Sequence, residues 1–151
     1  MSRKTIGYRL FRLGRVPRGV RPRLEAEGVR LLDEGIRVDL SLRGYRAPGR
    51  FFGYRRQLLS GSIVLTSARL AGYVWWGTLF DVPLGDPRLA KLDLSIPRRS
   101  LLQVAFDAAD FGERRSGRVL CRFRTETAEA FVASIATNLR QREAEPPTSA
   151  P

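Results

Sequence analysis

The chain has 151 residues, 43% of them hydrophobic, which fits one ordinary globular domain. Its 27 Lys and Arg against 15 Asp and Glu give a net charge of +12, which favours an anionic partner: nucleic acid, phospholipid or an acidic protein surface. With no apolar run of about 18 residues, one cysteine and no histidine, the sequence argues against a membrane-spanning helix, an internal disulfide, His-based catalysis and most zinc sites.

Residues 1–23 are predicted to form a basic N-terminal arm, because they contain eight Lys or Arg and no acid. Residues 5–15 have the pattern of a basic amphipathic helix, which can lie on an anionic membrane surface. Two alternatives stay open: the arm packs its apolar residues on the body, or the arginine excess is only compositional. If nucleic acid is the partner, the arginines expected to contact it are Arg9, Arg12, Arg15 and Arg18.

From Gly35 onward the apolar residues recur with period two, which is typical of strands with one buried face. Pro83 indicates an edge strand or the end of a strand, because proline cannot donate to a ladder. The pattern predicts seven short strands near residues 36–42, 61–66, 69–76, 78–84, 89–97, 101–108 and 118–125.

One amphipathic helix is predicted over residues 125–143, with Thr125 as its N-cap and a proline-containing disordered tail over 143–151. We expect this helix to plug the open end of a bent sheet and to bury its apolar stripe there. The predicted core consists of Val38, Leu40, Ile63, Leu65, Val104, Phe106, Leu120, Phe131 and Ile135.

The order of elements resembles the pleckstrin-homology-like superfold, in particular its GRAM-type and bacterial PH-like domains. The residues that carry this resemblance are DEGIRVDLSL, GSIVLTSARLAGY (with Gly61, Leu65, Thr66, Arg69 and Leu70), FDVPLGDPRLAKL and GRVLCRFRTETAEAFVASI. The resemblance covers about residues 30–142 and implies a bent seven-stranded antiparallel sheet capped by one C-terminal helix. We therefore place the PH-like domain at residues 24–142.

The chain departs from this pattern at residues 44–59, which are longer and richer in arginine than a minimal first connection. This stretch forms either an elongated hairpin or an extra strand. In eukaryotic pleckstrin-homology domains, basic residues on this connection hold phosphoinositide phosphates, so the resemblance implies anion contacts for Arg43, Arg46 and Arg50. Guanidinium forks match phosphate oxygens, and the same argument adds Arg55 and Arg56 to the candidate site.

Aromatic residues mark a second candidate surface, made of Tyr45, Trp75 and Trp76. If Trp75 and Trp76 lie in a strand, they face opposite sides. We then expect one in the core and the other on the outer face beside Tyr73, where it contacts a partner or membrane or is covered by the arm.

Catalysis is not expected, because the usual constellations are missing and Cys121 fits a packed structural thiol. Several carboxylates near turns could gather a cation or form an acid–base pair: Asp81, Asp86, Asp93, Asp107 and Asp110. The alternative is turn chemistry, in which an Asp side chain accepts from a nearby backbone N–H.

The sequence predicts a non-enzymatic cytoplasmic binding module without cofactor or metal. We expect it to dock to an anionic phospholipid surface, at the inner face of the membrane, or to a protein partner. The alternative is a nucleic-acid-binding protein that uses the arm.

Overall fold

The structure is a computed structural model that describes residue 4 and residues 15–144. Seven antiparallel strands make up most of it, with one long C-terminal helix, as the sequence predicts. The strands are β1 (Val29–Ala47), β2 (Arg50–Thr66), β3 (Arg69–Val74), β4 (Gly77–Pro83), β5 (Asp93–Arg98), β6 (Leu101–Asp107) and β7 (Ser116–Arg124). The helical segments are α2 (Arg21–Glu27), η1 (Pro87–Lys91), η2 (Ala108–Asp110) and α3 (Ala128–Ala144).

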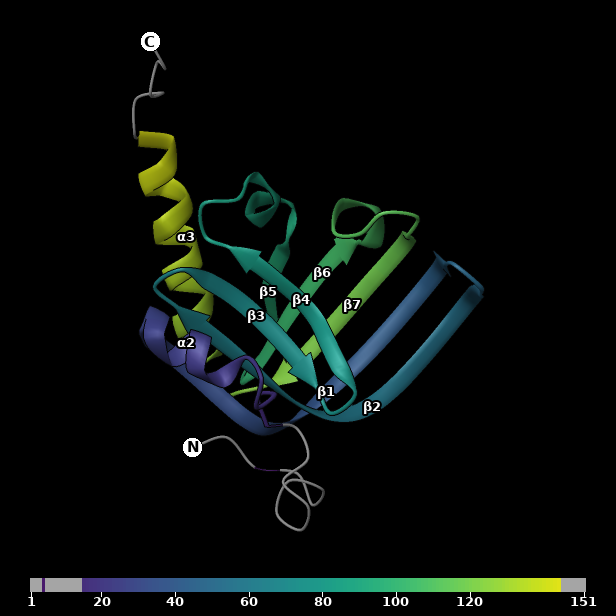
Figure 1. Cartoon of the computed structure of the whole chain (residues 1–151), viewed down its shortest axis with the longest axis horizontal. Coiled ribbons are helices and arrows are strands. Elements are labelled where there is room, and N and C mark those ends of the chain that lie inside the picture. The colour runs from purple at the N-terminus through teal and green to yellow at the C-terminus, as the bar shows by residue number, and fades with distance from the viewer. Residues whose placement is uncertain (1–3, 5–14, 145–151) are drawn as a thin grey trace.

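All seven strands belong to one sheet, in the order β4-β3-β2-β1-β7-β6-β5. The sheet bends so that β4 and β5, its two edges, lie on the same side of the molecule (Figure 1). Pro83 therefore lies on an edge strand, as predicted. The central strand β1 pairs with β2 along its length, and its second half also pairs with β7.

The arginine-rich stretch after Gly44 is an elongated hairpin. β1 and β2 pair without interruption as far as Ala47 and Arg50, so no separate strand is inserted. Leu42 and Tyr45 both face the concave side of the sheet although they are three residues apart. The shift arises at Gly44, which has a positive φ of 55° and adds one residue to the alternation. The hairpin is thereby kinked towards the concave side.

α3 closes one side of the bent sheet. Its Phe131 and Ile135 are buried in the main core, and Val132 and Leu139 pack against that core. The Arg142 guanidinium donates to the Leu84 carbonyl at 3.3 Å, so the helix reaches from β5 and β6 to the chain that follows β4.

The start of α3 differs from the prediction, because the helix begins at Ala128 rather than directly after Thr125. Thr125 is buried, and its hydroxyl donates to Asp33 Oδ2 at 2.8 Å. It also accepts from the Thr127 N–H at 3.3 Å, so Thr125 organises the turn that leads into the helix.

One predicted core residue is wrong. Leu120 is only half-buried, because its register partners are Ser41 and Ala105, on the convex side of the sheet. The neighbouring positions Val119 and Cys121 point into the core instead. The other eight predicted core residues are buried.

The N-terminal segment packs on the convex side of β2 and β3. Val16 and Leu24 form a second buried cluster with Tyr73, Val64 and Ala71. α2 crosses the expected boundary between arm and domain at residue 23, so residues 16–24 belong to the packed body. The amphipathic stretch 5–15, apart from Arg15, and the proposed tail 143–151, apart from Glu143 and Ala144, lie outside the described residues, as do Arg9 and Arg12.

Ion pairs fasten this N-terminal segment to the sheet. Lys4 Nζ lies 2.9 Å from Asp33 Oδ1, and Arg21 pairs with Glu34. Arg69 pairs with Glu27 of α2 at 2.7 Å and with Asp81 of β4 at 3.0 Å. Hydrogen bonding from Arg69 lowers the pKa of Glu27 below its usual 4.5.

No helix among the described residues has the length and apolar character needed to cross a membrane.

Candidate functional site

The β1–β2 hairpin carries all five arginines of the predicted anion site, but the sheet divides them between two faces. Arg50 and Arg55 line a cavity on the concave side. Arg43, Arg46 and Arg56 alternate along the two strands with the residues that line the cavity, and they lie on the convex side. The five therefore cannot surround one phosphate, because a strand directs successive side chains to opposite faces.

The convex side of the hairpin is a row of exposed aromatic and aliphatic side chains with arginines beside them. Phe51 and Tyr54 are each 61% exposed, and Leu58 is 54% exposed. The Arg43 guanidinium carbon lies 5.7 Å from the centre of the Tyr54 ring, and that of Arg46 lies 5.1 Å from the centre of the Phe51 ring. These distances are those of cation–π contacts. We call these five residues the outer row.

Arg56 differs from the other convex arginines because it already has a partner. Its guanidinium contacts both carboxylate oxygens of Asp39, the shorter contact being 2.6 Å. This hydrogen bonding lowers the pKa of Asp39, the one acidic residue in the stretch 37–60. Arg56 and Asp39 thus neutralise each other, and Arg56 is removed from the candidate anion contacts.

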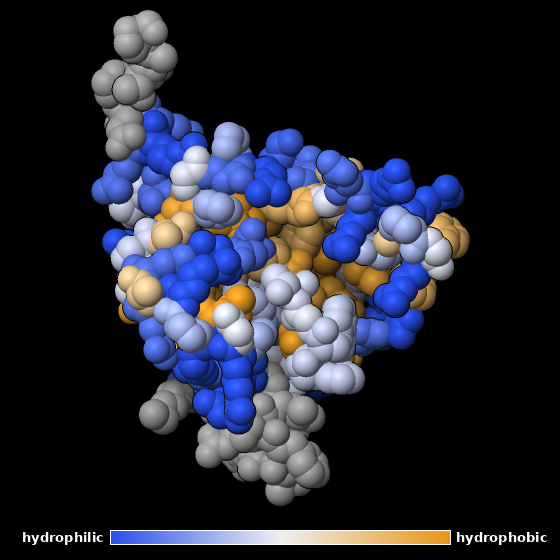
Figure 2. All heavy atoms as spheres, viewed as in Figure 1, coloured by the Kyte–Doolittle hydropathy of each residue, from blue (hydrophilic) through white to orange (hydrophobic). Residues whose placement is uncertain are grey.

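The concave side of the hairpin forms one wall of a cavity of about 570 Å³. Its floor is apolar and includes Leu40, Leu42, Phe80, Phe106 and Val119. Figure 2 shows a hollow with a hydrophobic floor and a hydrophilic rim on the face presented in Figure 1. Tyr45 and Phe52 stack near the mouth with ring centres 6.3 Å apart.

Among residues 15–144, four arginines line this cavity: Arg50, Arg55, Arg88 and Arg115. Arg55 lies over the Phe52 ring at 4.8 Å. The Gln57 amide, oriented with its oxygen towards Arg55, accepts from that guanidinium at 2.7 and 2.8 Å.

Arg88 and Arg115 are absent from the predicted site. Arg88 follows β4 and pairs with Asp86 at 2.7 Å, which lowers the pKa of that carboxyl. Arg115 belongs to the turn before β7 and lies near the hairpin because Ser116 pairs with Arg46. The pairing of β7 with β1 brings Arg115 to the cavity, and the position of η1 after β4 brings Arg88 there. No local motif marks either residue.

The tryptophan prediction is wrong in one respect, since neither Trp75 nor Trp76 is in the core. Both lie in the turn between β3 and β4, 59% and 52% exposed, because β3 ends at Val74. Trp76 lines the cavity and Trp75 does not. Tyr73 is buried under residues 16–24 rather than exposed on the outer face.

The carboxylates that the sequence offered for cation binding or acid–base chemistry are engaged in turns and ion pairs. Asp107 accepts from the Ala109 N–H at 2.8 Å, and Asp110 pairs with Lys91 at 3.1 Å. Asp81 pairs with Arg69, Asp86 with Arg88, and Asp93 lies 3.8 Å from Arg118. Burial raises the pKa of the Cys121 thiol to about 12, which keeps it protonated and unreactive at neutral pH.

Comparison with protein-family models, with curated proteins and with solved structures finds no match to this chain.

Proposed function

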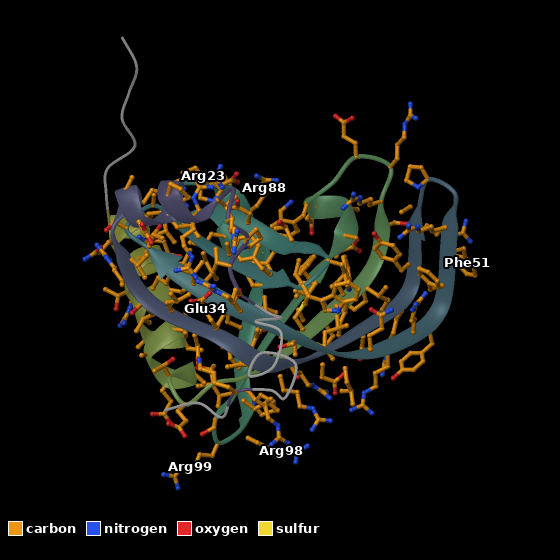
Figure 3. All side chains as sticks on the ribbon, turned by 60° about the horizontal axis from the view of Figure 1, so that its bottom comes forward. Arg23, Glu34, Phe51, Arg88, Arg98 and Arg99 are labelled. Carbon is orange, nitrogen blue, oxygen red and sulfur yellow. The ribbon has the colours of Figure 1, made fainter. Side chains whose placement is uncertain are left out.

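We propose that this protein is a non-enzymatic PH-like, GRAM-like module that docks onto an anionic membrane surface through the outer row. The support for the PH-like part is the element order: seven antiparallel strands followed by a helix that packs its apolar stripe against the sheet. The support for docking is the hairpin, which extends away from α3 and presents Phe51 outward at its end (Figure 3).

The observation that carries the proposal is the pairing of exposed rings with arginines on one face of the hairpin. Phe51 and Tyr54 are more than half exposed, and each has a guanidinium beside it. Aromatic rings favour the boundary between head groups and acyl chains, where guanidinium groups bind lipid phosphates. Each basic residue near an anionic surface contributes about 1 kcal/mol of attraction.

A lipid surface fits the outer row better than a protein partner does, because the unpaired charges of the outer row are all positive. Asp39 is the one acid in residues 37–60, and Arg56 already neutralises it. Arg43 and Arg46 have no carboxylate partner among the described residues. A uniformly anionic layer of phosphates complements such a row.

Sedimentation with vesicles tests this proposal. The full chain is expected to bind phosphatidylcholine vesicles that contain phosphatidylglycerol, and not vesicles of phosphatidylcholine alone. The double variant R43Q/R46Q is expected to bind at least about tenfold more weakly at physiological salt, since it loses two phosphate contacts. F51S is expected to weaken binding with unchanged stability, because its side chain is exposed.

The matched control is R98Q/R99Q, which removes the same charge. These two exposed arginines lie in the β5–β6 region, far from Phe51 in Figure 3. The control should bind like the wild type. Equal losses in both double variants would mean that only net charge matters. Binding abolished by removal of residues 1–14 but retained by R43Q/R46Q would assign the function to the arm. No vesicle binding at all would favour a protein partner.

A further inference from the structure

The cavity on the concave side of the hairpin is separate from the outer row, and its shape and chemistry point to a small ligand. Its volume of about 570 Å³ lies within the range of about 300–1,000 Å³ typical of small-molecule sites. Its walls come from β1, β2, β4, β6, β7 and the turns near η1 and η2, so residues distant in sequence enclose it.

The floor of the cavity is hydrocarbon and aromatic. Leu40, Phe80 and Phe106 are buried core side chains whose surfaces also line the cavity, and Leu42 is half-buried there. Phe111 packs against Phe106 with ring centres 4.9 Å apart, which extends the apolar wall towards the mouth. Such a floor stabilises an apolar group by removing its surface from water.

The charged residues around the cavity have mainly one sign. Asp81, the one acidic lining residue within the described part of the chain, pairs with Arg23 and Arg69, and Arg88 pairs with Asp86. Arg50, Arg55 and Arg115 have no carboxylate partner among the described residues. The hairpin and the turn before β7 bring Arg50 and Arg115 to the same end of the cavity, because Arg46 pairs with Ser116 and Ala47 with Arg50.

We propose that this cavity binds a single-chain amphiphile whose hydrocarbon tail lies on the apolar floor and whose anionic head group is bound by Arg50 and Arg115. The head is a carboxylate or a phosphate, since a guanidinium binds both as a two-oxygen acceptor. This binding goes beyond membrane docking, because it uses the opposite face of the hairpin and a single dissolved molecule. The ligand needs both parts. The apolar floor offers no polar group to a head group, and the arginines offer no apolar surface to a tail.

Trp76 provides a built-in reporter of occupancy. It lines the cavity, whereas Trp75, the other tryptophan of the chain, does not. In W75F the remaining indole is Trp76, and titration with decanoate below its micelle concentration should give a saturable change in fluorescence. In W76F the remaining indole is Trp75, and the same titration should leave the emission unchanged.

Calorimetry separates the contributions of head and tail. Decanoate and decyl phosphate are expected to bind, whereas acetate and inorganic phosphate, which lack the tail, and decyl glucoside, which lacks the charge, should bind at least about tenfold more weakly. R50Q and R115Q should each weaken decanoate binding about tenfold, and R98Q, which removes an arginine outside the cavity, should bind like the wild type. All three replaced side chains are exposed, so folding should be retained, which a thermal melt of each variant checks.

Three results would overturn the proposal: no saturable binding of either amphiphile, equal affinity for decanoate and acetate, or unchanged affinity in both R50Q and R115Q. Membrane docking can fail without affecting this test, because the amphiphile is offered as monomers and not as a surface.

Discussion

Gly117 lies where β7 meets the kink of β1. Its φ is 106°, a conformation that residues with a side chain rarely adopt. A Cβ at this position would lie against the Gly44 carbonyl and 2.6 Å from the Tyr45 Cα, both backbone atoms that cannot rotate away. The close approach of Gly117 to Gly44 therefore holds β7 against the hairpin at the point where the hairpin bends.

Gly117→Ala is expected to lower the free energy of unfolding by about 1–3 kcal/mol, since it adds both backbone strain and a steric clash. Gly53→Ala is the matched control, because a Cβ there meets nothing within 4 Å and its φ is not positive. Denaturant unfolding of the two variants measures the difference. A Gly117→Ala variant as stable as Gly53→Ala would show that β7 and β1 are not in close contact at the kink.

At the scale of elements, α3 packs against the sheet through a few large buried side chains. Phe131 is fully buried in the cluster that also contains Ile135, Leu102 and Phe123. The helix contacts β5 and β6 and reaches the chain after β4 through Arg142. Loss of its packing would expose the core side chains beneath it, including Leu102 and Phe123.

Phe131→Ala is expected to cost about 3–5 kcal/mol of unfolding free energy, because it leaves a cavity between the helix and the sheet. Ala133→Ser, on the exposed side of the same helix, serves as a control and should stay within about 0.5 kcal/mol of the wild type. Chemical denaturation followed by circular dichroism measures both. A loss well below 1 kcal/mol for Phe131→Ala would mean that α3 does not close the sheet.

At the scale of the whole molecule, a net charge of +12 acts against the compact state. Several carboxylates are already paired, including Asp39, Asp86 and Glu27, whose pKa values their arginine partners lower. The remaining arginines repel one another over distances that salt screens, since the Debye length falls from about 30 Å at 0.01 M to about 8 Å at 0.15 M.

We therefore expect the melting temperature to rise by several degrees when sodium chloride increases from about 0.01 M to about 0.15 M. Repeating the melt with sodium fluoride separates general screening from specific binding of chloride, because both salts should give the same rise. A melting temperature that falls with salt would show that local ion pairs, such as Arg69 with Glu27 and Asp81, outweigh the long-range repulsion.

Several parts of the fold follow from local sequence patterns. The period-two alternation after Gly35 predicts the middle of β1, Pro83 predicts the edge strand, and the apolar stripe around Phe131 predicts α3. These predictions succeed because alternation and helical spacing need only neighbouring residues. The predictions that Leu120 is in the core and that one of Trp75 and Trp76 is in the core are wrong for the opposite reason. The face of a strand depends on its register, and the end of a strand depends on its partner.

The sequence by itself determined the charge, the strand-rich class and the presence of an arginine-rich and aromatic stretch at residues 44–59, and the structure decided that this stretch is a hairpin. The tertiary structure alone decided which arginines act together. It separates Arg43 and Arg46 from Arg50 and Arg55 by the alternation of β1 and β2, and it adds Arg88 and Arg115 from distant turns. The physical reason is that the alternation of neighbouring residues sets the direction of a side chain in a strand. Arginines from distant segments reach one cavity only because the sheet bends and brings its two edges together.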